Sequence, residues 1–305
     1  MLCDFAEIAV RKNRQKMGPI WMAYFQRVSV VIPCYNHAIY VADAINSVLE
    51  QAYPDLELIV VNDGSTDTSL DVIEALAVEH GFIVIDQSNS GLTAAVNAGF
   101  SKSTGSFFIS FDADDIMLPG RIERQQAYLS AHPEAGCCAA NYEYIDFAGV
   151  PIPGAEQKAP ARYSFEDIFA GKAWMGGPTS MYRSDAIRAV GGFDTDIAIQ
   201  DQPMELQLAH AGYYMDIISD VVTQYRRHAD NMSKDYKKNF PVYLKAIERY
   251  RAEPGFMAAK RHLVNSALKS AVVEDKAFAR ELFAQLPLRA WDRKTLRRLR
   301  HYFFK

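Results

Sequence analysis

The fold is decided by residues 28–63, VSVVIPCYNHAIYVADAINSVLEQAYPDLELIVVND, where an apolar run is followed by a helical pattern and a second apolar run. Val28–Ile32 is a short β-branched run that predicts a buried strand, which we expect Pro33 to end. Residues 38–51 place apolar side chains at helical spacing, and LELIVVNDGSTD (56–67) predicts a second buried strand that ends in a Gly-Ser turn. This order is typical of two parallel strands joined by a crossover helix.

The alternation continues along the chain. Residues 66–77 predict a helix, 81–91 a third strand, 92–100 a short helix and 106–115 a fourth strand. We therefore predict an α/β fold with a mostly parallel, doubly wound central sheet and flanking helices. Three later segments, 136–146, 176–187 and 213–228, predict strands of a mixed sheet, with a helix over 201–212 between them. After about residue 235 only helical patterns remain.

Three of the predicted strands end in polar residues, which are Pro33-Cys34-Tyr35-Asn36, Asn62-Asp63 and Asp112-Ala113-Asp114-Asp115. In open α/β sheets ligands bind beyond the carboxyl ends of the strands. Three carboxylates in four positions repel one another and are costly to desolvate. A cation such as Mg²⁺ or Mn²⁺ would relieve this repulsion while it binds phosphate oxygens. We therefore predict a metal ion that carries a diphosphate, although a single Asp such as Asp67 or Asp115 is more often a turn or cap residue.

The composition narrows the class of protein. With a net charge of −4, bulk electrostatics do not favour a nucleic-acid partner. No apolar run of about 18 residues predicts a membrane span, and charges interrupt any signal-peptide pattern at the N-terminus. The turn PCYNHA after the first strand contains no glycine, which excludes a P-loop or dinucleotide fingerprint there. The cysteines, Cys3, Cys34, Cys137 and Cys138, show no metal-ligand spacing, so we expect reduced, buried thiols in a cytoplasmic protein.

Four segments in order, residues 28–69, SGLTAAVNAGF (90–100), FDADD (111–115) and GGFDTDIAIQDQPMELQLAHAG (191–212), resemble family 2 glycosyltransferases with the GT-A fold. The resemblance implies a GT-A domain over 28–235, between an N-terminal extension (1–27) and a C-terminal helical region (236–305). It implies an inverting enzyme that moves a sugar from a nucleotide-diphosphate sugar, with a UDP-sugar as the expected donor, to an acceptor hydroxyl. The expected acceptor is a surface polysaccharide or a lipid-linked glycan.

The resemblance also implies roles for individual residues. It implies contacts with the nucleotide-sugar by Pro33, Tyr35, Asp63 and Asp112. It implies that Asp114 and His228 bind Mn²⁺ or Mg²⁺, whereas from the sequence alone His228 belongs to a surface basic patch beside Arg226 and Arg227. Arg226 or Arg227 is predicted to add charge-assisted hydrogen bonds to the diphosphate. Asp201 is implied as the catalytic base, at a position where Asp otherwise serves as an N-cap.

Departures from the family pattern keep two alternatives open. The later helix commonly opens with Glu-Asp, but here it reads Gln200-Asp201-Gln202-Pro203, which leaves room for a glycosyltransferase-like binding module without catalysis. A sugar nucleotidyltransferase is the second alternative, although such enzymes usually carry a Gly-rich loop with a basic residue after the first strand. Trp174 is predicted either to stack on a sugar face or to fill core space.

The C-terminal tail is strongly basic. Residues 289–305 hold seven basic side chains against one acid, Asp292, which gives a local net charge of +6. On a helix the apolar side chains fall mainly on one side; they are Leu288, Trp291, Leu296, Leu299, Tyr302 and Phe303. A basic amphipathic helix with aromatic residues predicts peripheral contact with an anionic membrane, here its cytoplasmic face. The alternative is a helix that packs its apolar stripe on the rest of the protein.

Overall fold

The computed structural model describes residues 25–173, 175, 177–229, 231 and 235–304. Most of the predicted N-terminal extension and the predicted role of Trp174 therefore lie outside the described residues. Of that extension, Phe25 is buried and its ring contacts Tyr53 edge-on at 5.4 Å between centroids. The Tyr53 hydroxyl donates to the Gln26 carbonyl at 2.6 Å, so the chain is already anchored to the domain ahead of the first strand.

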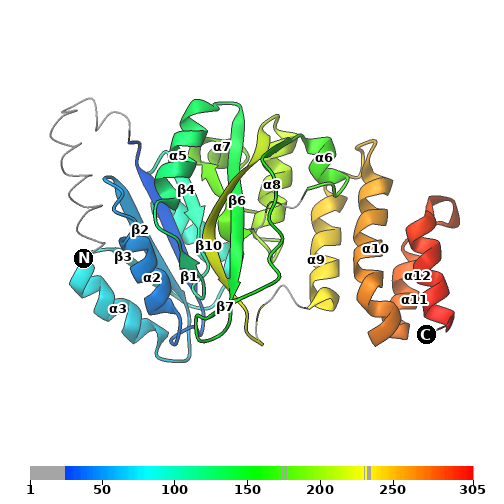
Figure 1. Ribbon diagram of the computed structural model, residues 1–305, viewed down its shortest axis with the longest axis horizontal. Helices are drawn as coiled ribbons and strands as arrows, with labels where there is room; N and C mark the ends of the chain where they lie inside the picture. Colours follow the sequence, from blue (N-terminus) through cyan, green and yellow to red (C-terminus); the bar gives the residue numbers. More distant parts are fainter. Residues whose placement is uncertain (1–24, 174, 176, 230, 232–234, 305) are drawn as a thin grey trace.

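The first half of the domain alternates as predicted. Its elements are β1 (Val28–Cys34), α2 (Val41–Leu49), β2 (Leu56–Asp63), α3 (Ser69–His80), β3 (Ile83–Gln87), α4 (Leu92–Lys102), β4 (Phe107–Ser110), β5 (Ile116–Met117) and α5 (Arg121–Ala131). The pairs β1–β2, β1–β4 and β2–β3 are all parallel, which confirms the doubly wound arrangement. These pairs bring the carboxyl ends of β1, β2 and β4 to one edge of the sheet (Figure 1).

The first strand does not end at Pro33 as predicted, because it continues to Cys34 in register with Asn62. The Val31 carbonyl faces β4, since it accepts from the Phe111 N–H at 2.8 Å, and residue 33 faces the same side two positions later. β4 pairs with β1 only over Val28–Val31, so among the described residues no strand lies beside Pro33 on the side that its nitrogen faces, whereas β2 pairs with it on the other side through Val61. The missing N–H of proline therefore costs no ladder hydrogen bond here.

The second half completes one ten-stranded mixed sheet. Its elements up to the last strand are β6 (Ala135–Ile145), β7 (Pro151–Ile152), β8 (Ala161–Tyr163), α6 (Phe165–Phe169), η1 (Gly177–Thr179), β9 (Met181–Arg183), α7 (Ser184–Ala189), α8 (Asp201–His210) and β10 (Tyr214–Arg226). The strand order is β3-β2-β1-β4-β9-β6-β10-β5, with β7 beside β6 and β8 beside β10. Of the described residues in the predicted strand at 176–187, only Met181–Arg183 form a strand, because Pro178 cannot donate in a ladder and Ser184 begins a helix.

Two apolar clusters cover the two faces of this sheet. Phe107 belongs to the cluster under α2, α3 and α5, whereas Phe108 belongs to the cluster under α4, α7 and α8. The same alternation separates Cys137 from Cys138 on β6. Strands buried on both faces need apolar residues at successive positions, which explains the continuous apolar runs in the sequence.

The C-terminal region is helical, as predicted, and forms a third apolar cluster. Its elements are α9 (Tyr236–Glu248), α10 (Phe256–Glu274), α11 (Lys276–Ala284), η3 (Leu288–Ala290) and α12 (Arg293–Phe304). Figure 1 shows these helices extending from the α8 side of the sheet, with α12 at the far end. Within the described part of the chain, none of the helices has the length and apolar character needed to cross a membrane.

Arg121, the first residue of α5, is a fully buried cation beneath the acidic loop that follows β4. Its guanidinium donates to the Pro178 carbonyl at 2.7 Å, to the Thr223 hydroxyl at 2.8 Å and to the side chain of Gln125 at 3.0 Å. Burial lowers the pKa of Arg121 to about 9, although the charge of Asp115 opposes that shift. The guanidinium therefore joins α5, η1 and β10 below the site.

Replacement of Arg121 by Met should destabilise the whole domain. The variant leaves the Pro178 carbonyl without its charged donor and Asp115 without a nearby buried cation. Loss of one partner of a buried charge network typically costs about 3–5 kcal/mol. Urea unfolding followed by circular dichroism measures this loss. Arg124→Met is the matched control, because Arg124 lies on the same helix with 40% of its side chain exposed; equal stability of the two variants would contradict the role of Arg121.

Candidate active site

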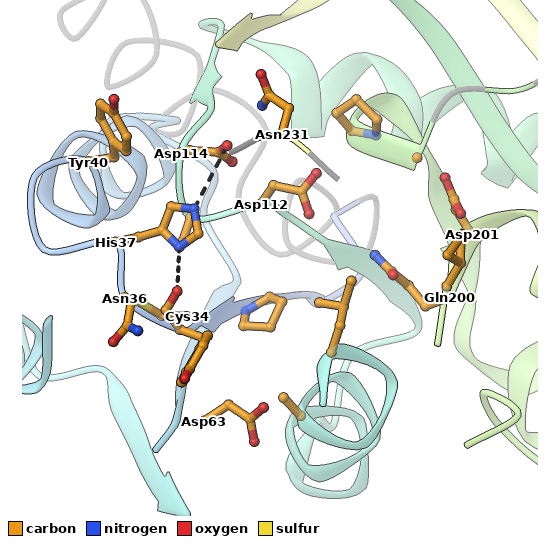
Figure 2. Close-up of a pocket in the computed structure, with 18 of the residues that line it drawn as sticks. Cys34, Asn36, His37, Tyr40, Asp63, Asp112, Asp114, Gln200, Asp201 and Asn231 are labelled. Carbon is orange, nitrogen blue, oxygen red and sulfur yellow. Dashed lines mark hydrogen bonds and ion pairs between the residues drawn. The ribbon is translucent and has the colours of Figure 1, made fainter. Parts of the chain in front are cut away.

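A cavity of about 860 Å³ opens at the carboxyl ends of β1 and β2 and beside the loop after β4. Seven of the eight predicted site residues line it: Pro33, Tyr35, Asp63, Asp112, Asp114, Asp201 and His228. The eighth, Arg226, is not among the lining residues. In Figure 2 Asp114 lies on one side of the cavity and Asp201 on the opposite side, with Asp112 between them.

Asp63 ends β2 as a buried carboxylate held by three donors. It accepts from the Gln87 side chain at 2.7 Å and from the backbone N–H groups of Ser90 and Gly91 at 2.9 Å each. These bonds fix the carboxylate at the cavity wall, where it has remaining lone pairs. Pro33 and Tyr35 line the same cavity from the end of β1, and the Tyr35 side chain is largely exposed.

The loops after β1 and β2 are fastened to each other by Asn36. Its side-chain oxygen accepts from the Thr66 N–H at 2.7 Å, while its own N–H donates to the Ser65 hydroxyl at 3.1 Å. Asn36 adopts a φ of 57°, a left-handed conformation that Asn tolerates better than most residues. These hydrogen bonds fix the two loops relative to each other, and with them the residues Tyr35 and Asp63 of the cavity wall.

Two histidines flank Asp114. The Nε2 atom of His228 lies 2.7 Å from Asp114 Oδ2, and the Nε2 atom of His37 lies 3.9 Å from the same oxygen. The donor atoms of these three residues all lie within 4.8 Å of one another. A carboxylate and two imidazoles are suitable ligands for a divalent metal ion. His37 was missed by the sequence analysis, although it follows the end of the first strand, the same sheet edge as Asp114.

The acidic loop after β4 holds carboxylates in unfavourable surroundings. Burial, then the charges of Asp114 and Asp201, raise the pKa of Asp112 to about 7. Burial also raises the pKa of Asp115 well above its usual range. Asp115 accepts from the Arg226 backbone N–H at 2.9 Å, so it supports the loop and does not cap a helix. Repulsion of this kind is what a bound cation relieves.

Arg226 lies behind this loop, although the sequence predicted a contact with the nucleotide-sugar. Its side chain is 2% exposed, and its Nε donates to the Asp114 carbonyl at 2.7 Å. Its other nitrogens reach the Phe147 carbonyl and the Asp43 carboxylate, each at 3.1 Å. The guanidinium also stacks on the Tyr40 ring, 4.8 Å from its centroid. A contact with diphosphate would require it to give up these bonds, so the geometry makes Arg226 a support for Asp114.

Asp201 opens α8 on the far side of the cavity. Burial raises its pKa, opposed by the backbone N–H groups of Gln202, Asp201 and Gly177, and Oδ1 has no hydrogen-bond partner among the described residues. A Cβ added at Gly177 would collide with the Asp201 carboxylate, so only glycine allows this close approach. Asp201 is therefore a confined carboxylate with one buried, unpartnered acceptor oxygen, which suits a general base.

A wall of tyrosines completes the cavity. Tyr142 and Tyr144 on β6 and Tyr225 on β10 form an aromatic cluster with centroid distances of 5.3–5.8 Å. Tyr243 joins the cavity lining from α9, in the C-terminal helical region. The sequence analysis did not single out these tyrosines, because they come from three separate elements.

Comparison with known sequences agrees with this geometry. The model of glycosyl transferase family 2 matches residues 29–191. An uncharacterized glycosyltransferase of Nostoc sp. (strain PCC 7120) is 35% identical over 177 residues, which cover 55% of this chain and 54% of that protein. The putative glycosyltransferase EpsH of Bacillus subtilis (strain 168) is 27% identical over 246 residues, which cover 77% of this chain and 70% of EpsH. The chain thus spans about half the length of the Nostoc protein.

Solved structures share the fold. TarS of S. aureus (residues 1–349), in complex with UDP-GlcNAc, has a TM-score of 0.69 at 18% identity and covers 87% of this chain and 82% of that chain. The mannosyltransferase PcManGT from Pyrobaculum calidifontis, in complex with GDP-Man and Mn²⁺, has a TM-score of 0.61 at 21% identity, covering 85% and 79%. These likenesses confirm the predicted GT-A fold.

Arg226→Lys should weaken divalent-ion binding, because an ammonium cannot hold the Asp114 carbonyl, the Phe147 carbonyl and Asp43 together. Residues that support a metal ligand typically contribute about 10–100-fold to affinity. Titration of Mn²⁺ monitored by electron paramagnetic resonance gives the dissociation constant. Arg227→Lys is the control, since Arg227 is the exposed neighbour. An unchanged Mn²⁺ affinity in folded Arg226→Lys protein would contradict this role.

Proposed function

Because the chain belongs to glycosyl transferase family 2, we propose that it transfers a sugar from a nucleotide-diphosphate sugar to an acceptor hydroxyl, with inversion at the anomeric carbon. One observation carries this proposal. A single cavity holds a donor set for a divalent ion on one side and, on the other, a confined carboxylate with an unpartnered oxygen. A UDP-sugar is the donor that we favour.

In the proposed reaction the acceptor hydroxyl oxygen attacks the anomeric carbon of the donor sugar. The Asp201 carboxylate takes the hydroxyl proton as the new carbon–oxygen bond forms. The bond from the anomeric carbon to the β-phosphate oxygen breaks, and its electron pair leaves with the nucleoside diphosphate. A general base of this kind typically contributes about 10²–10⁴-fold to the rate. The raised pKa of Asp201 makes it a stronger base than an exposed aspartate.

The residues on the opposite side fit a divalent ion such as Mn²⁺ or Mg²⁺. Asp114 and His228 would hold it, because Asp114 Oδ2 and His228 Nε2 lie 2.7 Å apart. A carboxylate oxygen of Asp112 lies within 4.8 Å of one of Asp114. When bound, such an ion supplies positive charge that stabilises the diphosphate leaving group. Pro33, Tyr35 and Asp63 are proposed to hold the nucleotide, since they line the cavity at the ends of β1 and β2.

The tyrosine wall supports a glycan acceptor. Aromatic faces carry partial negative charge and pack against the C–H groups of a pyranose ring, while the phenol hydroxyls offer hydrogen bonds. Tyr142, Tyr144 and Tyr225 present both features within one cavity. We therefore propose an acceptor that carries sugar rings, as in a surface polysaccharide or a lipid-linked glycan.

Two alternatives remain as outcomes of one experiment. A binding module without catalysis would hold the nucleotide but turn nothing over, and a sugar nucleotidyltransferase would release pyrophosphate from a nucleoside triphosphate. TarS is described with UDP-GlcNAc and PcManGT with GDP-Man, so the donor panel should include UDP- and GDP-sugars. Release of nucleoside diphosphate from one of these sugars, dependent on Mn²⁺, supports a transferase. Binding of the nucleotide-sugar without release of nucleoside diphosphate supports the binding module without catalysis.

Asp201→Asn should lower turnover by about 10²-fold or more while the affinity for the nucleoside diphosphate changes little, because an amide keeps the shape but cannot take the proton. Turnover is measured with the donor identified in the panel, and affinity by calorimetry with Mn²⁺. Asp114→Ala is the contrasting variant, since it should lose metal-dependent affinity as well as turnover. Parallel losses in Asp201→Asn would make Asp201 a binding or structural residue.

The C-terminal tail divides its apolar residues between two surroundings. Trp291, Leu299 and Tyr302 pack on the third apolar cluster. This agrees with the alternative in which the tail packs its apolar stripe on the rest of the protein. The remaining apolar side chains are exposed; they are Leu288, Leu296, Phe303 and Phe304. Exposed basic residues accompany them on η3 and α12; they are Arg289, Arg293, Lys294, Arg297 and Arg300. We propose that this surface, the tail surface, contacts an anionic membrane from the cytoplasmic side, where it would bring the enzyme to a lipid-linked acceptor.

Replacement of Leu296, Phe303 and Phe304 by Ser should reduce binding to vesicles that contain phosphatidylserine, because it removes three exposed apolar side chains but none of the packed ones. Binding is measured by co-sedimentation at low and high salt, and salt should weaken it, since each basic residue near the surface contributes about 1 kcal/mol. The control is Val78→Ser with Val273→Ser, which are exposed outside the tail surface. Equal sedimentation of both variants would refute membrane contact.

A further inference from the structure

His37 lines the same side of the cavity as Asp114 and His228, the two residues proposed to hold the ion. Its Nε2 atom points toward Asp114 Oδ2 at 3.9 Å, as the dashed line in Figure 2 shows. Its ring meets the His228 ring edge-on, 6.2 Å between centroids. Donors on opposite sides of an ion with bonds of about 2.0–2.2 Å lie about 4.2 Å apart. The three donor atoms, all within 4.8 Å, are therefore close to the spacing that one ion requires.

The second ring nitrogen of His37 sets its tautomer. Nδ1 lies 2.8 Å from the Tyr35 carbonyl oxygen, and a carbonyl can only accept, so Nδ1 carries the proton. In the neutral ring Nε2 then keeps its lone pair and presents it to Asp114. Histidines that bind metals almost always donate their other N–H to a carbonyl, a carboxylate or water in this way. A histidine that served only to fill space would not need this orientation.

The backbone around His37 holds the ring in place. Its N–H donates to the Ser69 hydroxyl at 2.9 Å, and its carbonyl accepts from the N–H groups of Tyr40 and Val41 at 2.9 Å each, which ties it to the start of α2. The Tyr40 ring in turn packs against the His228 ring, 5.2 Å between centroids. Both imidazoles are thus fixed by their neighbours and face the same carboxylate.

We infer that His37 is a third protein ligand of the divalent ion, and that it makes the site prefer first-row transition-metal ions to Mg²⁺. Two imidazoles and one carboxylate form a nitrogen-rich donor set. Imidazole binds transition-metal ions well, whereas Mg²⁺ prefers oxygen ligands and gives up its water reluctantly. This inference deepens the proposed function, on which it rests for the presence of a catalytic ion, but it concerns metal binding and not sugar transfer.

The test compares His37→Gln with the full-length native protein, using Mn²⁺ and Mg²⁺ as probes in the presence of UDP. The variant should bind Mn²⁺ about tenfold or more weakly, because it loses a nitrogen ligand, while its Mg²⁺ affinity changes less than about threefold. Electron spin echo measurements on bound Mn²⁺ should detect two coupled imidazole nitrogens in the native protein and one in the variant. His80→Gln is the matched control, since His80 is exposed at the end of α3.

Several outcomes would overturn the inference. If His37→Gln leaves the ratio of Mn²⁺ to Mg²⁺ affinity unchanged, or if the native protein shows a single coupled nitrogen, His37 does not bind the ion. Weaker UDP affinity with unchanged metal affinity assigns His37 to the diphosphate instead. His37→Ala serves as a second variant if the glutamine protein does not fold. A native protein that couples Mn²⁺ to two imidazoles but transfers no sugar refutes the proposed function and leaves this inference standing.

Discussion

The concentration of negative charge at one edge of the sheet constrains the rest of this structure. Three carboxylates, those of Asp112, Asp114 and Asp115, lie within residues 112–115 after β4. The charge of Asp201, across the cavity, also raises the pKa of Asp112. Burial forbids full hydration of these groups, so each must be compensated by hydrogen bonds, by protonation or by a cation. Burial and the neighbouring carboxylates raise the pKa of Asp112 and of Asp115, which is the electrostatic strain that a cation would relieve.

The protein balances the negative charge of the acidic loop from the side that faces away from the cavity, and leaves it unbalanced on the cavity side. Arg121 and Arg226 are the two largest fully buried side chains, and both lie under or behind the acidic loop. Arg226 holds the Asp114 carbonyl and so fixes the loop, whereas Arg121 holds the Pro178 carbonyl of η1, and both supply positive charge. Neither lines the cavity, so the remaining charge faces the space where an ion and a diphosphate would enter. His37 and His228 offer neutral nitrogen ligands there without adding further negative charge.

The opposite wall depends on segments from later in the chain. Gly177 allows Asp201 to approach η1, and Glu205, one turn further along α8, is buried with its pKa raised first by burial and then by Asp201. Tyr243 comes from α9, so the C-terminal helical region contributes to the cavity as well as to the tail surface. This wall of the cavity is thus assembled from β6, η1, α8, β10 and α9.

The sequence by itself determined the parallel first half of the sheet and the place of the site. Continuous β-branched runs and crossover helices depend on local periodicity, and polar residues at strand ends must meet at one sheet edge. The placement of Asp63, Asp112 and Asp114 in one cavity follows from these local patterns. Local patterns predicted the end of the first strand wrongly at Pro33, because only the tertiary structure shows that β4 does not reach the side of Pro33 that its nitrogen faces.

Only the tertiary structure decided how the charges are distributed. The contact of Arg226 with Asp43 joins residues 183 positions apart, and that of His228 with Asp114 joins residues 114 positions apart. No periodicity links such positions, so the sequence could not show that Arg226 supports the loop from behind or that His37 faces Asp114. The position of the Asp201 carboxylate likewise depends on Gly177, which belongs to a different element, because a Cβ there would collide with Asp201 Oδ2. Packing sets which groups are buried together, and burial sets their electrostatics.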